Sequence, residues 1–342
     1  MTNTLTELLQ TRDWLLLDGA TGTNLFAMGL MSGDAPELWN VDAPDKIRAL
    51  HDGFINAGSD VILTNSFGGS RYRLKLHDAQ DRVHELNKLA GEIARECVDK
   101  SGRKVVVAGS VGPTGEILQP VGSLSHEDAV DAFREQIRGL QAGGVDVIWA
   151  ETISSEEEFR AVAEAAAAED APFCGTLSFD TAGRTMMGVT SSGFAGMAAS
   201  VPNAPLALGA NCGTGAPDLL RTVLGITEAD PNAIVVAKAN AGIPKYVDGK
   251  IVYDGTPELM ARYACLARDA GARLIGGCCG TLPEHLVAMK AALEAHSPGA
   301  RPSLDHISEV IGPFSSADDG TGDTCCGGDR PRGRGGRRGR RR

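Results

Sequence analysis

The chain has 342 residues, of which 42% are hydrophobic and 23% charged, a balance typical of folded globular proteins and unlike disordered or membrane chains. Its longest apolar runs are only strand-length, and its first residues lack the basic start and apolar core of a signal peptide, so we expect a cytoplasmic protein. The net charge of -11 includes eight arginines in residues 330–342. The body is therefore more acidic still, which disfavours specific nucleic-acid binding. No membrane partner is expected, because no apolar run is long enough to span a bilayer.

Residues 330–342 form a glycine-rich, arginine-rich tail of low complexity. Such a segment cannot bury a core, so it is predicted to be disordered, either as an incidental solubilising tail or as a non-specific contact for RNA or an acidic surface. The eight cysteines, without an export signal, indicate metal binding or burial rather than disulfides. Cys325 and Cys326 lie in the polar stretch before the tail and are interpreted as adventitious.

In chain order, short apolar runs alternate with amphipathic helical stretches from residue 14 to about 295. The runs predict eight strands, at 14–18, 60–64, 104–109, 145–151, 173–179, 205–212, 233–240 and 272–279. Helices are predicted at 44–58, 81–100, 125–144 and 256–271, and several begin at Ser, Thr, Asp or Pro and end at Gly. The spacing leaves room for one crossover helix and two loops in each unit.

Eight such units predict an α/β fold of the (β/α)8 TIM-barrel type, as a single domain over residues 1–297. Residues 298–342 are expected to be irregular to disordered, with DHISEVIG (305–312) as one short helix. The rival architecture is an open doubly wound sheet with a separate domain. It is disfavoured because the alternation has no linker and no G-x-G-x-x-G follows the first strand.

The barrel prediction directs attention to the residues that end the strands, because barrel active sites lie at the C-terminal ends. Cys212 ends the sixth predicted strand, and Cys278 and Cys279 end the eighth. Three thiolates suit zinc, and three protein ligands leave one position open for a substrate. Cys97, Cys174 and Cys265 lie within helices or a strand and are interpreted as buried small hydrophobes.

The charge of the predicted site selects its chemistry. Three thiolates on Zn²⁺ carry a net charge of about -1, which weakens the ion as an acid for water. An incoming thiol would instead lose its proton and stay a nucleophile at neutral pH. The cysteine trio therefore predicts alkylation of sulfur rather than hydrolysis.

Two carboxylates are expected at the same mouth, Asp18 after the first strand and Glu151 after the fourth. An acidic pair can hold an ammonium group, and the loop Gly19-Ala20-Thr21 offers backbone N–H groups for a carboxylate or a phosphate. Together these groups indicate an amino-acid site. Asp18 also fits a helix cap or turn, and Glu151 a solvated loop carboxylate.

Three further residues are candidates for substrate contacts. Asn65 and Asn211 lie beside rim residues and either orient the substrate or form turns. Trp39, in the loop PELWN, offers an aromatic face for a quaternary ammonium or sulfonium group, or simply packs. His285 is interpreted as a helix residue rather than a ligand.

The motifs LDGATGTNL, LTNSF, GSVGPTGE, WAET, GANCG and IGGCCGTLPEH, in this order, resemble the homocysteine S-methyltransferase family over about residues 12 to 295, with bacterial betaine-dependent members the most similar. The resemblance implies zinc on Cys212, Cys278 and Cys279, with homocysteine as the methyl acceptor and its thiolate in the open position. It also implies that Asp18 and Glu151 contact the homocysteine ammonium, and that the backbone of residues 19–21 lies near its carboxylate.

The methyl donor is less constrained by the resemblance. The chain shows no folate- or cobalamin-binding module, so direct transfer from a small cationic donor is expected. Trp39 stands where betaine-using enzymes have a tryptophan of the donor cage, which favours glycine betaine. Gly68 replaces an aromatic residue of the animal betaine enzymes, which leaves S-methylmethionine, S-adenosylmethionine or another sulfonium as the alternative donor.

Two rival functions remain from the sequence: a zinc- or thiol-binding barrel without activity, and an RNA-associated protein led by its tail. The carboxylate pair argues against the first, because storage of a metal needs no amino-acid pocket. Oligomeric state is not predicted.

Overall fold

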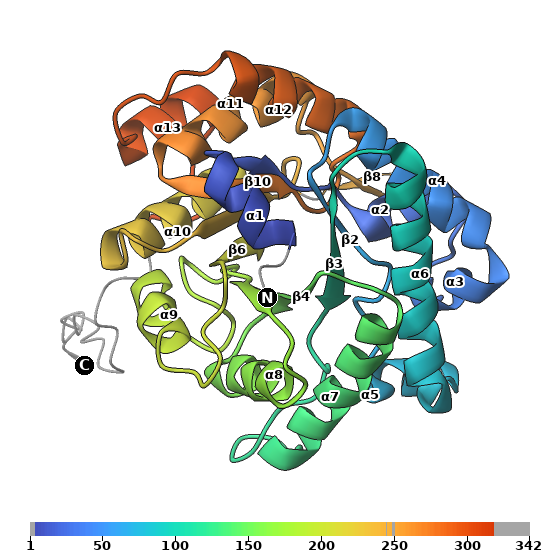
Figure 1. Ribbon diagram of the computed structural model, residues 1–342. Helices are drawn as coiled ribbons and strands as arrows, with labels where there is room; N and C mark the ends of the chain where they lie inside the picture. The colour runs from blue at the N-terminus through green and yellow to red at the C-terminus, as the bar shows by residue number, and fades with distance from the viewer. Residues whose placement is uncertain (1–3, 244, 248–249, 318–342) are drawn as a thin grey trace, which may run out of the picture.

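The computed structural model describes residues 4–243, 245–247 and 250–317 (Figure 1). Eight parallel strands form one sheet in the order β1-β10-β7-β6-β5-β4-β3-β2. They are β1 (Leu15–Leu16), β2 (Val61–Leu63), β3 (Val106–Val111), β4 (Val147–Ile153), β5 (Phe173–Leu177), β6 (Leu208–Cys212), β7 (Val235–Ala239) and β10 (Ala272–Gly277). A parallel bridge between Leu17 and Val61 joins the two outer strands. The predicted (β/α)8 barrel is therefore confirmed.

Helices surround the strands. They are α1 (Thr4–Thr11), α2 (Thr21–Ala27), α3 (Trp39–Asp42), α4 (Pro44–Ala57), α5 (Arg71–Leu74), α6 (Val83–Ser101), α7 (His126–Ala142), α8 (Glu156–Ala168), α9 (Ser191–Ala198), α10 (Ala216–Ala229), α11 (Pro257–Asp269), α12 (Pro283–Ala295) and α13 (Leu304–Ile311). Short 3-10 turns are η1 (Pro36–Leu38), η2 (Lys75–His77) and η3 (Gln80–Arg82), and β8 (Lys245–Val247) pairs antiparallel with β9 (Lys250–Val252).

The helix ends follow the signals in the sequence. Ser125, Ser155 and Thr256 cap α7, α8 and α11 by accepting a hydrogen bond from the backbone N–H three residues on. Gly58 ends α4 in the left-handed conformation that glycine adopts without strain. Among the described residues, no helix has the length and apolar composition needed to span a membrane.

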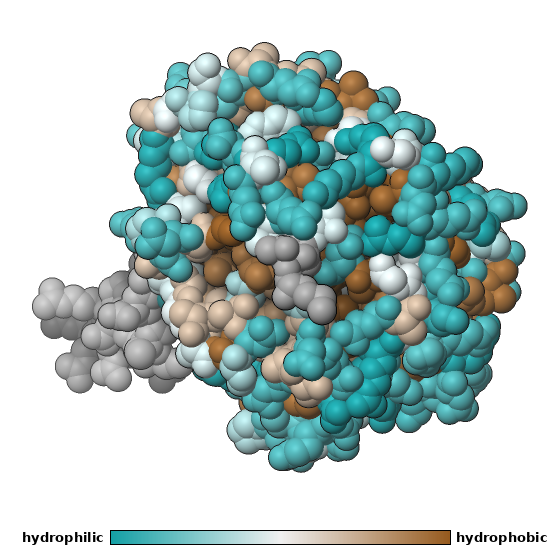
Figure 2. All heavy atoms as spheres, in the orientation of Figure 1, coloured by the Kyte–Doolittle hydropathy of each residue, from teal (hydrophilic) through white to brown (hydrophobic). Residues whose placement is uncertain are grey.

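Two hydrophobic cores hold the barrel together. The outer core lies between strands and helices, and the inner one fills the barrel with side chains that include Leu17, Val61 and Trp149. Leu5 and Leu8 of α1 belong to the inner core, and Figure 1 shows α1 lying across the barrel at the N-terminal ends of the strands. In the space-filling view, hydrophilic side chains cover most of the outer helices at this end (Figure 2). Because α1 closes the N-terminal end, the C-terminal end is the one left for a site.

The seam between β1 and β2 has little backbone pairing, and two buried aspartates reinforce it. At the N-terminal end, Asp60 accepts a hydrogen bond from the Leu16 N–H at 3.0 Å. At the C-terminal end, Asp18 accepts one from the Leu63 N–H at 2.7 Å. Each aspartate thus ties its own strand region to the neighbouring strand.

The short helix predicted at 305–312 is present as α13, and it packs against α10 and α11. Its residues Ile307 and Ile311 are buried in the outer core. The structure thus attaches this segment to the barrel, beyond the residue 297 at which the barrel was expected to end. The arginine-rich tail, Cys325 and Cys326 lie outside the described residues.

Candidate active site

Cys212, Cys278 and Cys279 converge at the C-terminal rim. Strand β7 lies between β6 and β10, and its residue Ala239 pairs with Cys212 on one side and with Gly277 on the other. The strand ends are therefore level, and the three sulfur atoms all lie within 4.8 Å of one another, with 4.0 Å between Cys212 and Cys279. Tetrahedral zinc with Zn–S bonds of about 2.3 Å separates its sulfur ligands by about 3.8 Å. The trio fits such an ion.

Asn240, at the end of β7, connects the two cysteine loops. Its side-chain amide donates to the Gly213 carbonyl at 2.8 Å, and its side-chain oxygen accepts from the Cys279 N–H at 3.0 Å. Cys212 itself has a φ of 62°, a left-handed conformation that a non-glycine residue adopts only when its surroundings enforce it. The sequence analysis missed Asn240, although it stands at a strand end in the run AIVVAKAN.

The crowding of the thiols opposes their ionisation. A hydrogen bond from Cys278 lowers the pKa of Cys212, but hydrogen bonding with Cys279 and burial outweigh it and leave that pKa at about 11. Three neighbouring thiols of this kind remain largely protonated at neutral pH unless a cation is present. The donor set therefore suits a metal that binds thiolates.

Asn211 lies beside the trio and makes hydrogen bonds to β4 and β5. Its side-chain oxygen accepts from the Thr152 N–H at 2.8 Å and from the Thr176 hydroxyl at 2.7 Å, and its amide lies 3.9 Å from the Cys278 sulfur. Thr152, the residue after Glu151, has a φ of 62°. Asn211 thus fixes the strained end of β4 next to the cysteines.

A lysine that the sequence analysis missed pairs with the first predicted carboxylate. Lys238 of β7 and Asp18 are both almost fully buried, and the Lys238 ammonium lies 2.7 Å from an Asp18 oxygen. Burial acts to lower the pKa of Lys238, but the charges of Asp18 and Glu151 outweigh it and raise the pKa. The ammonium therefore stays charged. Since Leu63 occupies the other Asp18 oxygen, this carboxylate already has a partner at each oxygen.

Glu151 is the more accessible carboxylate. It is half-buried, and the Ser110 hydroxyl donates to one of its oxygens at 2.5 Å. Desolvation raises its pKa, although the Lys238 charge opposes the shift. Asp18 and Glu151 thus share one internal cation at the rim, and Glu151 keeps the exposure that a ligand would need.

The loop after β1 lies against the loop after β10. The Ala20 N–H donates to the Thr281 carbonyl at 3.2 Å, and the Thr23 hydroxyl accepts from the Gly280 N–H at 3.2 Å. A side chain on Gly19 would meet the same carbonyl at 2.7 Å, so this glycine permits the close approach. Thr21 begins α2. The predicted carboxylate-binding loop is therefore next to the cysteines.

Trp39 was expected in a loop, but it is the first residue of α3, directly after η1, and Asn65 follows β2. The Lys46 ammonium lies 4.2 Å from the centre of the Trp39 ring, so this aromatic face holds a cation of the chain itself. The Asn65 amide donates to the Pro36 carbonyl at 2.8 Å and to the Asn40 side chain at 3.0 Å. Asn65 thus ties η1 and α3 to the end of β2.

Tyr253, which the sequence analysis also missed, follows β9 and lies against Gly280, the residue after Cys279. Its ring fills the space beside Gly280, where an added Cβ would come within 2.4 Å of it. Its hydroxyl is hydrogen-bonded to Cys279, and burial raises the pKa of this tyrosine. A hydroxyl is thus present at the edge of the trio.

Cys97, Cys174 and Cys265 lie within helices or a strand, and His285 lies in α12. Cys97 and Cys174 are buried in α6 and β5, and Cys265 is half-buried in α11. The His285 ring accepts from the Leu282 N–H at 3.0 Å and lies 2.9 Å from the Gly255 carbonyl. His285 therefore caps α12 and links it to the loop before α11.

The fold and the site define a class of (β/α)8 barrel that carries a three-cysteine centre beside buried acid groups at its C-terminal rim. Within this class, the chain belongs to the homocysteine S-methyltransferase family, which it matches over residues 15–293. It is accordingly an S-methyltransferase that uses homocysteine as the methyl acceptor.

Solved structures agree with this assignment. The metallated form of the homocysteine methyltransferase MmuM from Escherichia coli is 27% identical, with a TM-score of 0.70 and coverage of 84% of this chain and 99% of that chain. For its apo form the identity is 27% and the TM-score 0.67, over 85% and 100% of the two chains. A methyltransferase from Methanosarcina mazei, 14% identical, shares the fold with a TM-score of 0.53 over 86% and 99% of the chains.

Proposed function

We propose that this protein transfers a methyl group from a small cationic donor, most readily glycine betaine, to homocysteine, with zinc held by Cys212, Cys278 and Cys279. The observation that carries the proposal is the convergence of three sulfur atoms within 4.8 Å at the rim of a barrel of this family. A metallated relative of similar structure supports the choice of a metal centre.

The residues of the chain have separate tasks. Zinc, when bound, would lower the pKa of an incoming thiol so that its sulfur is nucleophilic at neutral pH. Asn240 holds the two cysteine loops together through Gly213 and Cys279, and Asn211, the residue before Cys212, contacts the Cys278 sulfur. The acceptor sulfur attacks the donor methyl in line; a sulfur–carbon bond forms as the bond from the methyl to nitrogen breaks, and the electron pair leaves with nitrogen. Positioning of the two substrates supplies most of the acceleration.

Recognition of the acceptor falls mainly to Glu151 in this proposal. The homocysteine ammonium pairs with Glu151, because Asp18 is already engaged by Lys238 and acts on the substrate through that ion pair. The backbone of residues 19–21 lies near the substrate carboxylate. Lys238 leaves the pair of carboxylates with one net negative charge, which matches a single ammonium group.

Betaine as donor is supported by Trp39, whose face already accommodates an ammonium group. A sulfonium donor is the second candidate, and a buried carboxylate favours it. Glu37 accepts a hydrogen bond from the Gly68 N–H at 2.6 Å, and its carboxylate fills the space in which a Gly68 side chain would stand. Burial raises the pKa of Glu37, and its ionised form would suit a donor with a net positive charge better than zwitterionic betaine.

A donor panel tests the proposal. The purified protein is incubated with homocysteine and either betaine, S-methylmethionine, S-adenosylmethionine or dimethylsulfoniopropionate, and methionine is measured by mass spectrometry. We expect the highest rate with betaine, loss of that rate after zinc removal, and recovery when zinc is restored. Absence of methionine with all four donors contradicts the methyl transfer, and an unchanged rate after zinc removal contradicts the role of the metal.

A further inference from the structure

The segment that follows the barrel returns to the loop that carries Cys212. Helix α13 packs on α10 and α11 through Ile307 and Ile311. Beyond it, residues 312–316, which we term the C-terminal strap, run along the start of α10. None of these residues falls within the stretch 15–293 that defines the family.

Four contacts attach the strap to α10 and to the loop before it. The Ser315 N–H donates to Asp218 at 3.0 Å, and the Ser315 hydroxyl lies 3.3 Å from the Thr214 hydroxyl. The Arg221 guanidinium stacks 3.9 Å from the centre of the Phe314 ring and donates to the Ser316 carbonyl at 2.9 Å. Asp218 and Arg221 are each only 8% exposed, so these charged groups are enclosed where the strap lies on α10.

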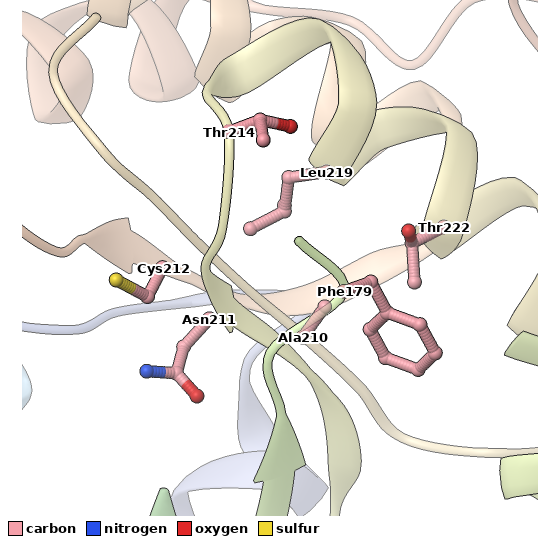
Figure 3. Close-up of a pocket in the computed structure, with 7 residues that line it drawn as sticks. All are labelled: Phe179, Ala210, Asn211, Cys212, Thr214, Leu219 and Thr222. Atoms are coloured by element: carbon pink, nitrogen blue, oxygen red, sulfur yellow. The ribbon is translucent and has the colours of Figure 1, made fainter. Parts of the chain in front are cut away.

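The loop that the strap contacts has an unusual backbone. Cys212, Gly213 and Gly215 have φ values of 62°, 74° and 130°, and Thr214 lies between the two glycines. Glycine-rich backbone of this kind has many alternative conformations, so external contacts are needed to fix one of them. Figure 3 shows Thr214 on this loop and the Cys212 side chain pointing away from Leu219 and Phe179, which line a small hollow behind it.

We infer that the C-terminal strap positions Cys212 as a ligand of the metal centre; the inference rests on the proposed metal site. Cys212 reaches the other two cysteines from a different loop, so its placement decides whether the three sulfur atoms meet. Asn240 fixes this loop from the barrel side through Gly213, and Ser315 fixes it from the outside through Thr214. Phe314 and Ser315 are thus positioning residues that act through the loop.

The test compares zinc affinity in three full-length proteins by competition with a chromogenic chelator. They are the unaltered chain, the double variant Phe314→Ala/Ser315→Pro, and the control Leu304→Ala, which alters an exposed side chain of α13. Pro at 315 removes both the N–H and the hydroxyl, while α13 retains its packing. We expect about tenfold weaker zinc binding in the double variant alone, since groups that orient metal ligands typically contribute 10–100-fold in affinity.

A second measurement keeps the result interpretable if the double variant is less stable. In the metal-free proteins, alkylation of each cysteine is followed by mass spectrometry at a temperature where circular dichroism shows all three folded. Faster labelling of Cys212 with unchanged labelling of Cys278 supports the inference. Zinc affinity within twofold of the unaltered chain overturns it. A full-length unaltered chain that takes up no zinc overturns the proposed metal site, and the inference with it.

Discussion

At each end of the β1–β2 seam, a buried aspartate bridges the two strands, but the cation that pairs with the aspartate differs between the ends. At the N-terminal end, Asp60 pairs with Arg12, whose side chain is 37% exposed. At the C-terminal end, Asp18 pairs with Lys238, whose side chain is only 3% exposed and which also interacts with Glu151. A solvated arginine satisfies a carboxylate at little cost, whereas a buried ammonium requires its partner.

This difference separates the structural end of the barrel from the functional one. The inner core and α1 close the N-terminal end, and its charged groups are matched by solvent-exposed partners. The C-terminal end gathers Asp18, Glu151, Lys238 and three thiols, an arrangement that burial makes unfavourable for stability by itself. Groups kept in such surroundings are candidates for function.

The largest effect is expected from the loss of a cysteine ligand. Cys278→Ala should lower methionine formation by more than about 100-fold, because loss of a ligand exceeds the 10–100-fold cost of losing a group that merely orients one. Thermal unfolding of the metal-free protein should change little. Cys174→Ala, at a buried cysteine inside β5, is the matched control and should retain activity. Activity near the unaltered level in Cys278→Ala would place the chemistry elsewhere.

The two ion pairs of the seam can be compared directly. Lys238→Met should destabilise the protein by about 3–5 kcal/mol, since it leaves a buried carboxylate without its cation. Arg12→Met should cost no more than about 1 kcal/mol, because Arg12 is partly solvated and Arg103, 3.6 Å from the same Asp60 oxygen, still pairs with this carboxylate. Urea unfolding measures both values. Equal losses of stability in the two single variants would contradict the difference between the two ends. The double variant Asp18→Asn/Lys238→Met should recover most of the stability that Lys238→Met loses, because it removes the unpaired carboxylate as well.

Glu151→Gln tests whether the Glu151 carboxylate binds the homocysteine ammonium. We expect the KM for homocysteine to rise by about 10–100-fold with a smaller change in kcat, because hydrogen bonds to charged groups contribute about 1.5–3 kcal/mol. Steady-state kinetics with homocysteine as the varied substrate provide the measurement. A KM that stays within twofold would show that the acceptor ammonium is bound by other groups.

The pH dependence of stability gives the same residue a second test. Burial raises the pKa of Glu151 above 4.5, so the folded protein holds this proton more tightly than the unfolded chain does. The contribution of Glu151 to stability is therefore present below pH 4.5 and is lost as the pH rises through the raised pKa. Glu151→Gln should gain stability relative to the unaltered protein as the pH increases across this window. A difference that is constant with pH would contradict the shift.

The smallest effect is expected at Trp39 of α3. If the indole face contributes to the donor site, Lys46→Met removes a competing cation, and the KM for betaine should fall by about two- to fivefold, the range expected for an exposed cation–π contact. Kinetics with betaine as the varied substrate test this, and the KM for homocysteine serves as the internal control. An unchanged betaine KM would place Trp39 outside the donor site.

The fold and the cysteine centre could be predicted because both follow from position along the chain. Alternating apolar runs and capped helices predicted the eight barrel strands, and Cys212, Cys278 and Cys279 stand at strand ends. The short helix near residue 305 was also visible as an isolated apolar pattern, but its packing on α10 depends on tertiary contacts that no local pattern contains.

The partners of the predicted residues could not be derived in this way. Lys238 lies inside an apolar strand, where a charged residue signals a buried partner, but the sequence does not identify Asp18, 220 positions away, as that partner. Lys46 covers Trp39 only because α3 turns directly into α4. Asn65 shows that a position at a strand end does not by itself identify a substrate contact, because its side-chain amide is already hydrogen-bonded to Pro36 and Asn40.

In the proposed reaction, the acceptor sulfur binds at the cysteine trio. X-ray absorption at the zinc edge, with and without homocysteine, tests it most directly because sulfur neighbours are distinguished from lighter atoms. We predict three sulfur neighbours without homocysteine and four with it. A sulfur count that stays the same on addition of homocysteine would contradict the account.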